Sequence, residues 1–179
     1  MKGLAAFLPC WILIGCTATG PQYSPLEHTD SSGQHIVVYR YSQEVGGNSG
    51  TWVPGRVELD GKVIGKLPNN SFLVFNLPVG LFELSVTPMI DFHYADRHRM
   101  TLRDKVEKGE TAFFRVVSVW GSGPWGEGCA NIWEKVEGAE IAYTVIYPRP
   151  DWVQYFCLQR VPEAFASQQL MNLKLRRAN

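Results

Sequence analysis

The sequence predicts an all-β fold, an antiparallel β-sandwich that a single C-terminal helix completes. The chain of 179 residues contains 17 glycines and 11 prolines, so it is rich in turns. Short apolar or alternating runs recur between these turns at roughly 8–12-residue spacing, which is typical of sandwiches and small barrels. No helical pattern of about 10–15 residues separates the runs, which disfavours a parallel α/β sheet.

The predicted strands begin with a β-branched and aromatic run over residues 36–41. Asp60-Gly61 lies between alternating runs and predicts a two-residue hairpin turn, because both positions must tolerate positive φ. Asn69-Asn70 predicts a second turn. Phe82, Leu84 and Val86 alternate with polar residues, as in a sheet with one covered face. The other strands are expected at 57–59, 62–67, 72–77, 99–106, 111–120, 132–136 and 141–147.

A helix is expected from Pro162 towards Arg177. Pro162 suits a first helical position, and Glu163 complements the positive end of the helix dipole. Lys174, Arg176 and Arg177 would complement the other end. Phe165, Leu170 and Leu173 lie roughly on one face, so the helix is expected to close over a sheet.

The N-terminus predicts a bacterial lipoprotein. Lys2 precedes a short apolar run that starts at Leu4 and ends in Leu13-Ile14-Gly15-Cys16, which resembles a lipobox. In a lipobox the cysteine receives a diacylglycerol and becomes the first residue of the mature chain. The alternatives are a plain signal peptide or a membrane anchor, but the run contains Pro9 and is shorter than the roughly 20 residues that span a bilayer.

The predicted organisation has three parts: a signal peptide over 1–15, a lipidated flexible tether over 16–34, and a folded domain over 35–179. Only Tyr23 and Leu26 in the tether are candidates for burial. A flexible chain of about 18 residues has a mean reach of about 24 Å. Residue two of the mature chain would be Thr17 and not Asp. By resemblance to enterobacterial sorting, we expect the protein at the outer membrane.

The charge balance limits the classes of partner that the protein can bind, and the cysteine content predicts a disulfide. The chain has 17 basic and 17 acidic residues, and removal of Lys2 leaves 16 against 17, a formal net charge of −1. This balance argues against nucleic acid as a partner. We expect the protein to contact the membrane through its anchor and to bind an envelope protein of unidentified type.

Cys129 and Cys157 remain after processing. They predict a disulfide in an oxidising compartment, and the alternative is two buried thiols.

Several segments between residues 36 and 120 match the pattern of a known family. They are Val38-Tyr39-Arg40, Leu59-Asp60-Gly61-Lys62, Val63-Ile64-Gly65-Lys66-Leu67, Asn70-Ser71-Phe72, Leu77-Pro78-Val79-Gly80 and Lys108-Gly109-Glu110-Thr111-Ala112-Phe113-Phe114. On these segments the domain resembles a family of bacterial lipoproteins that carry a small domain of unknown function, and it departs from the family pattern at Val79 and Phe82. The resemblance implies an immunoglobulin-like or PEGA-like sandwich and no established activity.

The loop over residues 120–133 carries Trp120, Trp125 and Trp133 among glycines. Such rings either cap the open end of a sandwich or form a binding surface for a sugar or a protein. Of the three, Trp125 is the best binding candidate. The Gly-Ser-Gly-Pro-Trp-Gly run at 121–126 matches a dinucleotide-binding pattern only formally, since Pro124 lies where a helix would have to begin.

No sequence pattern predicts a catalytic, metal or cofactor site. The segment 93–98 contains two histidines and an aspartate, but an extended strand would place only Asp96 and His98 on one face, and a metal site usually needs three or four ligands. The sequence lacks the G-x-S-x-G and H-E-x-x-H motifs. We therefore expect a lipid-anchored binding or structural module in the periplasm and no enzyme. The alternatives are an envelope hydrolase or a carbohydrate-binding module that uses the 120–133 loop.

Overall fold

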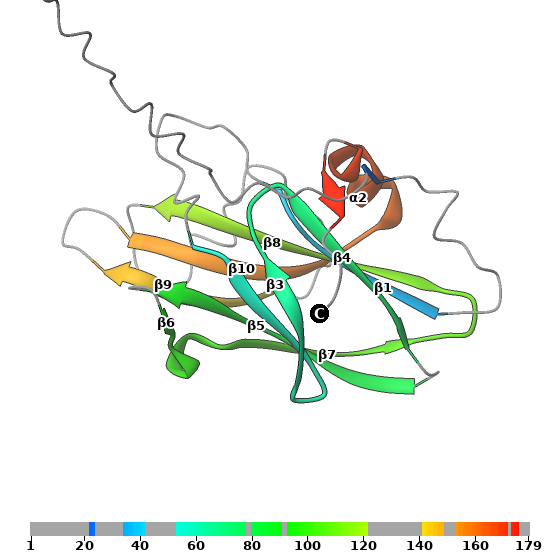
Figure 1. The fold of residues 1–179 in the computed structure, drawn as a ribbon, viewed down its shortest axis with the longest axis horizontal. Helices are drawn as coiled ribbons and strands as arrows, with labels where there is room; N and C mark the ends of the chain where they lie inside the picture. Colours follow the sequence, from blue (N-terminus) through cyan, green and yellow to red (C-terminus); the bar gives the residue numbers. More distant parts are fainter. Residues whose placement is uncertain are drawn as a thin grey trace, which may run out of the picture.

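In the part of the chain that it describes, the computed structural model confirms an all-β fold with one α-helix near the C-terminus (Figure 1). It describes residues 22–23, 34–41, 53–77, 80–90, 93–121, 141–148, 153–171 and 173–175. The elements are β1 (Gln34–Arg40), β2 (Gly55–Leu59), β3 (Lys62–Leu67), β4 (Ser71–Leu77), β5 (Gly80–Ile90), β6 (His93–Tyr94), the 3-10 helix η1 (Asp96–His98), β7 (Met100–Val106), β8 (Thr111–Gly121), β9 (Ile141–Pro148), β10 (Val153–Val161), α2 (Glu163–Leu170) and β11 (Lys174–Leu175).

The strands form two sheets. We call sheet A the one with order β11-β4-β1-β8-β10-β9, and sheet B the one with order β3-β2-β5-β7, in which β6 pairs with the far end of β5. Sheet A is mixed, whereas the sequence predicted antiparallel pairing throughout. β1 runs parallel to β8, and β4 runs parallel to β11. Between β1 and β8 the chain passes through sheet B twice, first as β2 and β3 and then as β5 to β7. It then returns to sheet A as β8, which lies beside β1 and runs in the same direction.

An apolar core lies between the two sheets, as a β-sandwich requires. The rings of Phe82 from sheet B and Phe114 from sheet A meet edge to face, with centroids 5.9 Å apart. Alternation supplies this core, because Phe82, Leu84 and Val86 point inward while Glu83, Ser85 and Thr87 occupy the opposite face of β5. The inward residues of sheet A come from its four central strands: Ile36, Val38, Leu73, Ala112, Phe114, Val116, Phe156 and Leu158.

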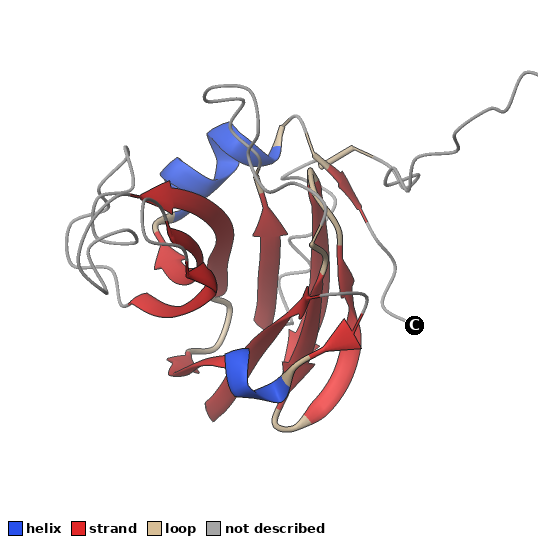
Figure 2. Cartoon of the chain, turned by 90° about the vertical axis from the view of Figure 1, so that its left-hand side faces the viewer, coloured by secondary structure: helices blue, strands red, loops and turns tan. Residues whose placement is uncertain are grey.

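A second apolar cluster lies on the other face of sheet A, under α2. Val37 and Tyr39 of β1 point into it, while Ile36 and Val38 point into the core between the sheets. Every residue of β1 is therefore buried. Figure 2 shows α2 in the upper part of the view and η1 in the lower part. The cluster under α2 lies on the face of sheet A opposite the core between the sheets, so α2 covers sheet A on the side away from sheet B.

The helix is shorter than predicted. It spans Glu163–Leu170, and Pro162 precedes it as an extended N-cap residue with ψ 149°. Lys174 and Leu175, which were expected to continue the helix, pair instead with β4 as β11. The unpaired edge of β4 offers backbone partners to these residues, which an extension of the helix would leave unused. The expected packing of the helix against a sheet is confirmed through Ala166 and Leu170.

The sequence did not predict β10. Its residues lie between two layers, with Phe156 and Leu158 facing sheet B and Val161 facing the helix side. A strand buried on both faces lacks the clear alternation by which half-buried strands are recognised. The strand expected at 132–136 lies outside the described residues.

The predicted turns are confirmed. Asp60 and Gly61 have φ values of 49° and 77°, and Asn70 has a φ of 49°. The carboxylate of Asp60 also accepts a hydrogen bond from the backbone N–H of Glu83 at 2.8 Å, which ties the hairpin to β5.

Gly55 generates a stability prediction, because a Cβ at this position would lie 2.8 Å from Cγ1 of Val86 across the strand pair. We expect Gly55→Ala to lower the free energy of unfolding by about 1–3 kcal/mol through overpacking. Val86→Ala removes the opposing methyl group, so the double variant should be less destabilised than the sum of the two single variants, by about 0.5–3 kcal/mol. Urea unfolding of the four proteins measures this coupling, and strict additivity would show that no steric clash exists.

Candidate functional site

The N-terminal segment is fixed to the domain at Gln22 and Tyr23. The Tyr23 backbone N–H donates to the carbonyl oxygen of Leu173 at 3.3 Å, and the side-chain amide of Gln22 donates to the carbonyl oxygen of Met171. The ring of Tyr23 meets the ring of Phe72 edge to face at 5.4 Å. The flexible tether expected over residues 16–34 therefore contains a fixed point.

The ring of Tyr23 joins the apolar cluster under α2, and the residue is only 8% exposed. Its neighbours in this cluster include Phe72, Leu170 and Leu173, from a strand, the helix and the segment that follows the helix. Burial raises the pKa of Tyr23, and the nearby carboxylate of Glu163 adds to this effect. We call the surface formed by Gln22, Tyr23 and Met171 the junction patch.

Polar contacts beside the junction patch fix α2 in place. The hydroxyl of Tyr39 donates to Oε1 of Gln169 at 2.8 Å, between the central strand and the helix. Arg115 is buried, its guanidinium lies 4.8 Å from the ring centroid of Phe165, and it donates to Oε1 of Gln159 at 2.9 Å. These contacts lock the helix in one register on sheet A, so the junction patch has a defined geometry.

Arg40 is a second buried cation in sheet A. Burial lowers its pKa to about 9, because a charged guanidinium loses hydration in the interior. The group still carries its charge at neutral pH. It lies 5.0 Å from the ring centroid of Phe156 and donates to the carbonyl oxygen of Val53, and both contacts stabilise that charge.

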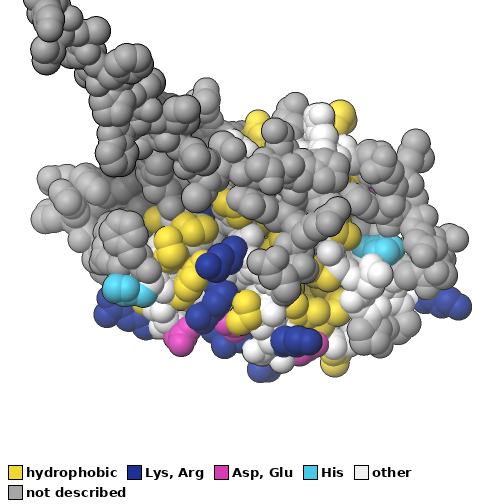
Figure 3. Space-filling model, viewed as in Figure 1, with side chains coloured by type: hydrophobic (Ala, Val, Ile, Leu, Met, Phe, Trp, Pro, Cys, Tyr) yellow, Lys and Arg dark blue, Asp and Glu magenta, His cyan; other side chains and the backbone are white. Residues whose placement is uncertain are grey.

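The outer face of sheet B carries a network of ion pairs, which we call the charged face. Its members are Arg56, Glu58, Glu83, Asp96, Arg99 and Arg103. Figure 3 shows basic side chains next to acidic ones along the lower part of the view. The alternation of β2 and β5 produces this face, since Val57, Leu84 and Val86 point into the core from the positions between.

Glu58 lies at the centre of the charged face, and its side chain is only 6% exposed. Its two carboxylate oxygens lie 2.7 Å from Nε of Arg56 and 3.0 Å from Nη2 of Arg99. Arg56 also pairs with Asp96, and its guanidinium lies 5.2 Å from the ring centroid of Tyr94. Burial raises the pKa of Tyr94, and the charge of Arg56 opposes that shift.

Glu83 continues the charged face towards β7. Its carboxylate accepts from Nε of Arg103 at 3.0 Å, and Nη2 of Arg99 lies at 3.7 Å. The six members comprise three cations and three anions, so their formal charges cancel. The carboxylates are thus engaged by arginines in a network of ion pairs.

Most of the residues singled out from the sequence lie outside the described part of the chain. Cys16, Trp125, Trp133 and Cys129 fall there, and of Trp120 only the backbone, in β8, is described. Cys157 is buried in β10 and its side chain is engaged with a partner. The Cys129–Cys157 disulfide and the binding role of the tryptophans stay predictions.

The segment 93–98 was expected to be extended, but it forms the short strand β6 followed by the 3-10 helix η1. Asp96 pairs with Arg56, whereas Nδ1 of His98 lies 3.1 Å from the hydroxyl of Thr144. Within the described ranges, no group of three or more His, Cys, Asp or Glu side chains is placed to hold a metal ion.

Two features of the structure were not identified as sites from the sequence. The only sequence feature that pointed to the packing of Tyr23 on the domain was an aromatic residue in an otherwise polar segment. The charged face was signalled by the alternation of charged and apolar residues in 56–58 and 99–103. Alternation predicts which face a side chain occupies, but it does not predict which arginine meets which carboxylate.

Glu58 provides a test of the charged face. We expect Glu58→Gln to lower the free energy of unfolding by about 1.5–3 kcal/mol, because two arginines lose their charged acceptor in a nearly buried position. The matched control is Glu107→Gln, since Glu107 has a 76% exposed side chain and lies 3.4 Å from Lys105. That change should stay within about 0.5 kcal/mol. Urea unfolding compares the two variants, and equal losses would contradict a central role for Glu58.

Tyr23 predicts a loss of stability at alkaline pH. A tyrosine whose pKa is raised above its ordinary value of 10.0 favours the folded state while it is neutral. Its contribution is complete below pH 10 and is lost as the pH rises through the folded-state pKa. We expect the stability difference between the wild type and Tyr23→Phe in urea unfolding to stay constant up to about pH 10, and the wild type to lose stability relative to the variant above that pH. Other titrating groups cancel in this difference, so a pH-independent difference would refute burial of the phenol.

None of the described helices is long and apolar enough to cross a membrane. No protein-family model, curated protein or solved structure matches the chain. The resemblance to a lipoprotein family therefore rests on the sequence segments alone.

Proposed function

We propose that this protein is a lipid-anchored lipoprotein of the bacterial envelope, whose domain acts as a binding or structural module at the outer membrane. Cys16 would carry the lipid, and residues 1–15 would be removed as the signal peptide. The proposal joins the Leu13-Ile14-Gly15-Cys16 motif to one structural observation. Tyr23, seven positions after Cys16, is docked on the folded domain.

The docked tyrosine supports the proposal because it lies after the predicted processing site. Cleavage before Cys16 retains Gln22, Tyr23 and every contact that they make. Removal of a signal peptide at this point is thus compatible with an intact fold.

The pairing of the charged side chains favours a binding or structural role over a catalytic one. The carboxylates of Glu58 and Glu83 are each paired with arginines, and the buried Arg115 is bonded to Gln159. Charged groups held in such networks stabilise a surface and set partner choice. A partner protein with complementary charges would suit the charged face of sheet B.

Replacement of the predicted lipid acceptor tests this proposal. Cys16→Ser should abolish incorporation of a fatty-acid probe and leave an uncleaved precursor or an unanchored product. Labelled cells, separated on a density gradient, should show wild-type protein with outer-membrane markers, since Thr17 follows Cys16. Equal labelling of wild type and variant would reject the lipid anchor, whereas recovery with inner-membrane markers would reject only the outer-membrane location.

A further inference from the structure

The junction patch lies close to the point at which the proposed lipid anchor joins the chain. Six peptide steps separate Cys16 from Gln22, and an extended chain spans at most about 3.6 Å per residue, or roughly 22 Å in all. A tether that ran free to the start of β1 would contain about three times as many steps. Docking of Tyr23 would therefore hold the α2 side of the domain near the lipid.

The surface beside the junction patch is poor in charge. Among Pro162–Met171, which comprise α2 and its two cap residues, Glu163 is the only charged side chain. Met171 at the end of the helix is 53% exposed, although methionine is an apolar residue. An uncharged surface loses little hydration when it approaches a lipid interface, and an exposed apolar side chain gains from entering it.

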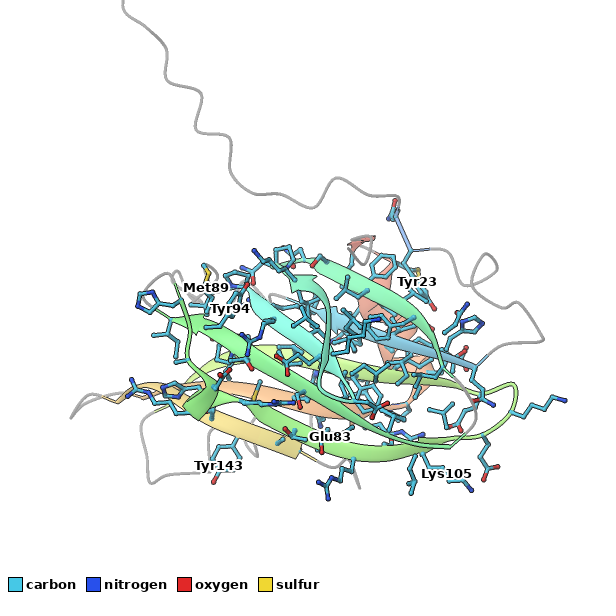
Figure 4. The ribbon with its side chains drawn as sticks, turned by 60° about the horizontal axis from the view of Figure 1, so that its bottom comes forward. Tyr23, Glu83, Met89, Tyr94, Lys105 and Tyr143 are labelled. Atoms are coloured by element: carbon cyan, nitrogen blue, oxygen red, sulfur yellow. The ribbon has the colours of Figure 1, made fainter. Side chains whose placement is uncertain are left out.

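The opposite side of the domain carries more charge, although Val63 of β3 and Leu81 of β5 in sheet B are also exposed. The charged face carries six ionic side chains on sheet B, and sheet A separates it from α2. Figure 4 shows Tyr23 well separated from Glu83. Placing the charged face against lipid would require these ions to lose water, which is far more costly than burying neutral groups.

We propose that the junction patch is the membrane-facing surface of the domain and that it rests on the lipid headgroups. The charged face is then turned away from the membrane, towards a partner. This inference rests on the proposed lipid anchor at Cys16. It adds an orientation and a second contact, which an anchor on a flexible tether would not supply.

A matched pair of probes tests this orientation. The full-length lipidated protein is prepared as Met171→Cys and as Val63→Cys, because these side chains are exposed to nearly the same extent, 53% and 52%. Val63 lies on β3 of sheet B, and the protein without either change measures background labelling of the native cysteines. Each variant is labelled with a fluorophore and reconstituted into phosphatidylethanolamine–phosphatidylglycerol vesicles that contain a headgroup nitroxide lipid.

We expect the nitroxide to quench the label at position 171 and to leave the label at position 63 unquenched. Adding Tyr23→Ala should abolish the quenching at 171, because the undocked chain no longer holds the patch near the lipid.

Equal quenching at both positions, or stronger quenching at 63, would overturn the orientation. Mass spectrometry of the N-terminal peptide from the same samples separates the two proposals. An acylated Cys16 with equal quenching rejects the membrane-facing patch and leaves the anchor intact. A Cys16 without acyl chains rejects both.

Discussion

The fold depends on a first strand that is buried on both of its faces. Each residue of β1 is buried, with Ile36 and Val38 in the core between the sheets and Val37 and Tyr39 in the cluster under α2. A strand in this position requires two covering layers, so sheet B and the helix are both necessary. It also needs a neighbour along each edge, which β4 and β8 provide.

The two outer sides of the domain then differ because different layers form them. On one side α2 and the docked Tyr23 present a surface with little charge beside an exposed Met171. On the other side sheet B presents arginines and carboxylates that neutralise one another around Glu58. Under the proposed lipid anchor, a short linker attached to one of two unequal sides would give the domain a defined orientation.

Local features of the sequence predicted much of sheet B and the turns. Asp60-Gly61 closes the hairpin because a tight turn of this kind needs two residues that tolerate positive φ, and such a requirement is local. Alternation in 82–87 predicted which side chains enter the core, since the period of a strand is set by its backbone. The lipobox, the disulfide and the tryptophan loop are likewise predictions from sequence, and they fall mainly outside the described residues.

The sequence by itself thus determined the all-β class, the hairpin and the division of strand residues into apolar and polar faces, because backbone period and turn conformation are local properties. Only the tertiary structure decided what each strand and side chain meets. Strand β10 is buried on both sides, β11 pairs with β4 and does not extend the helix, and Tyr23 docks on Phe72. These outcomes depend on contacts between residues far apart in the chain, and no local pattern specifies which distant surface will need covering.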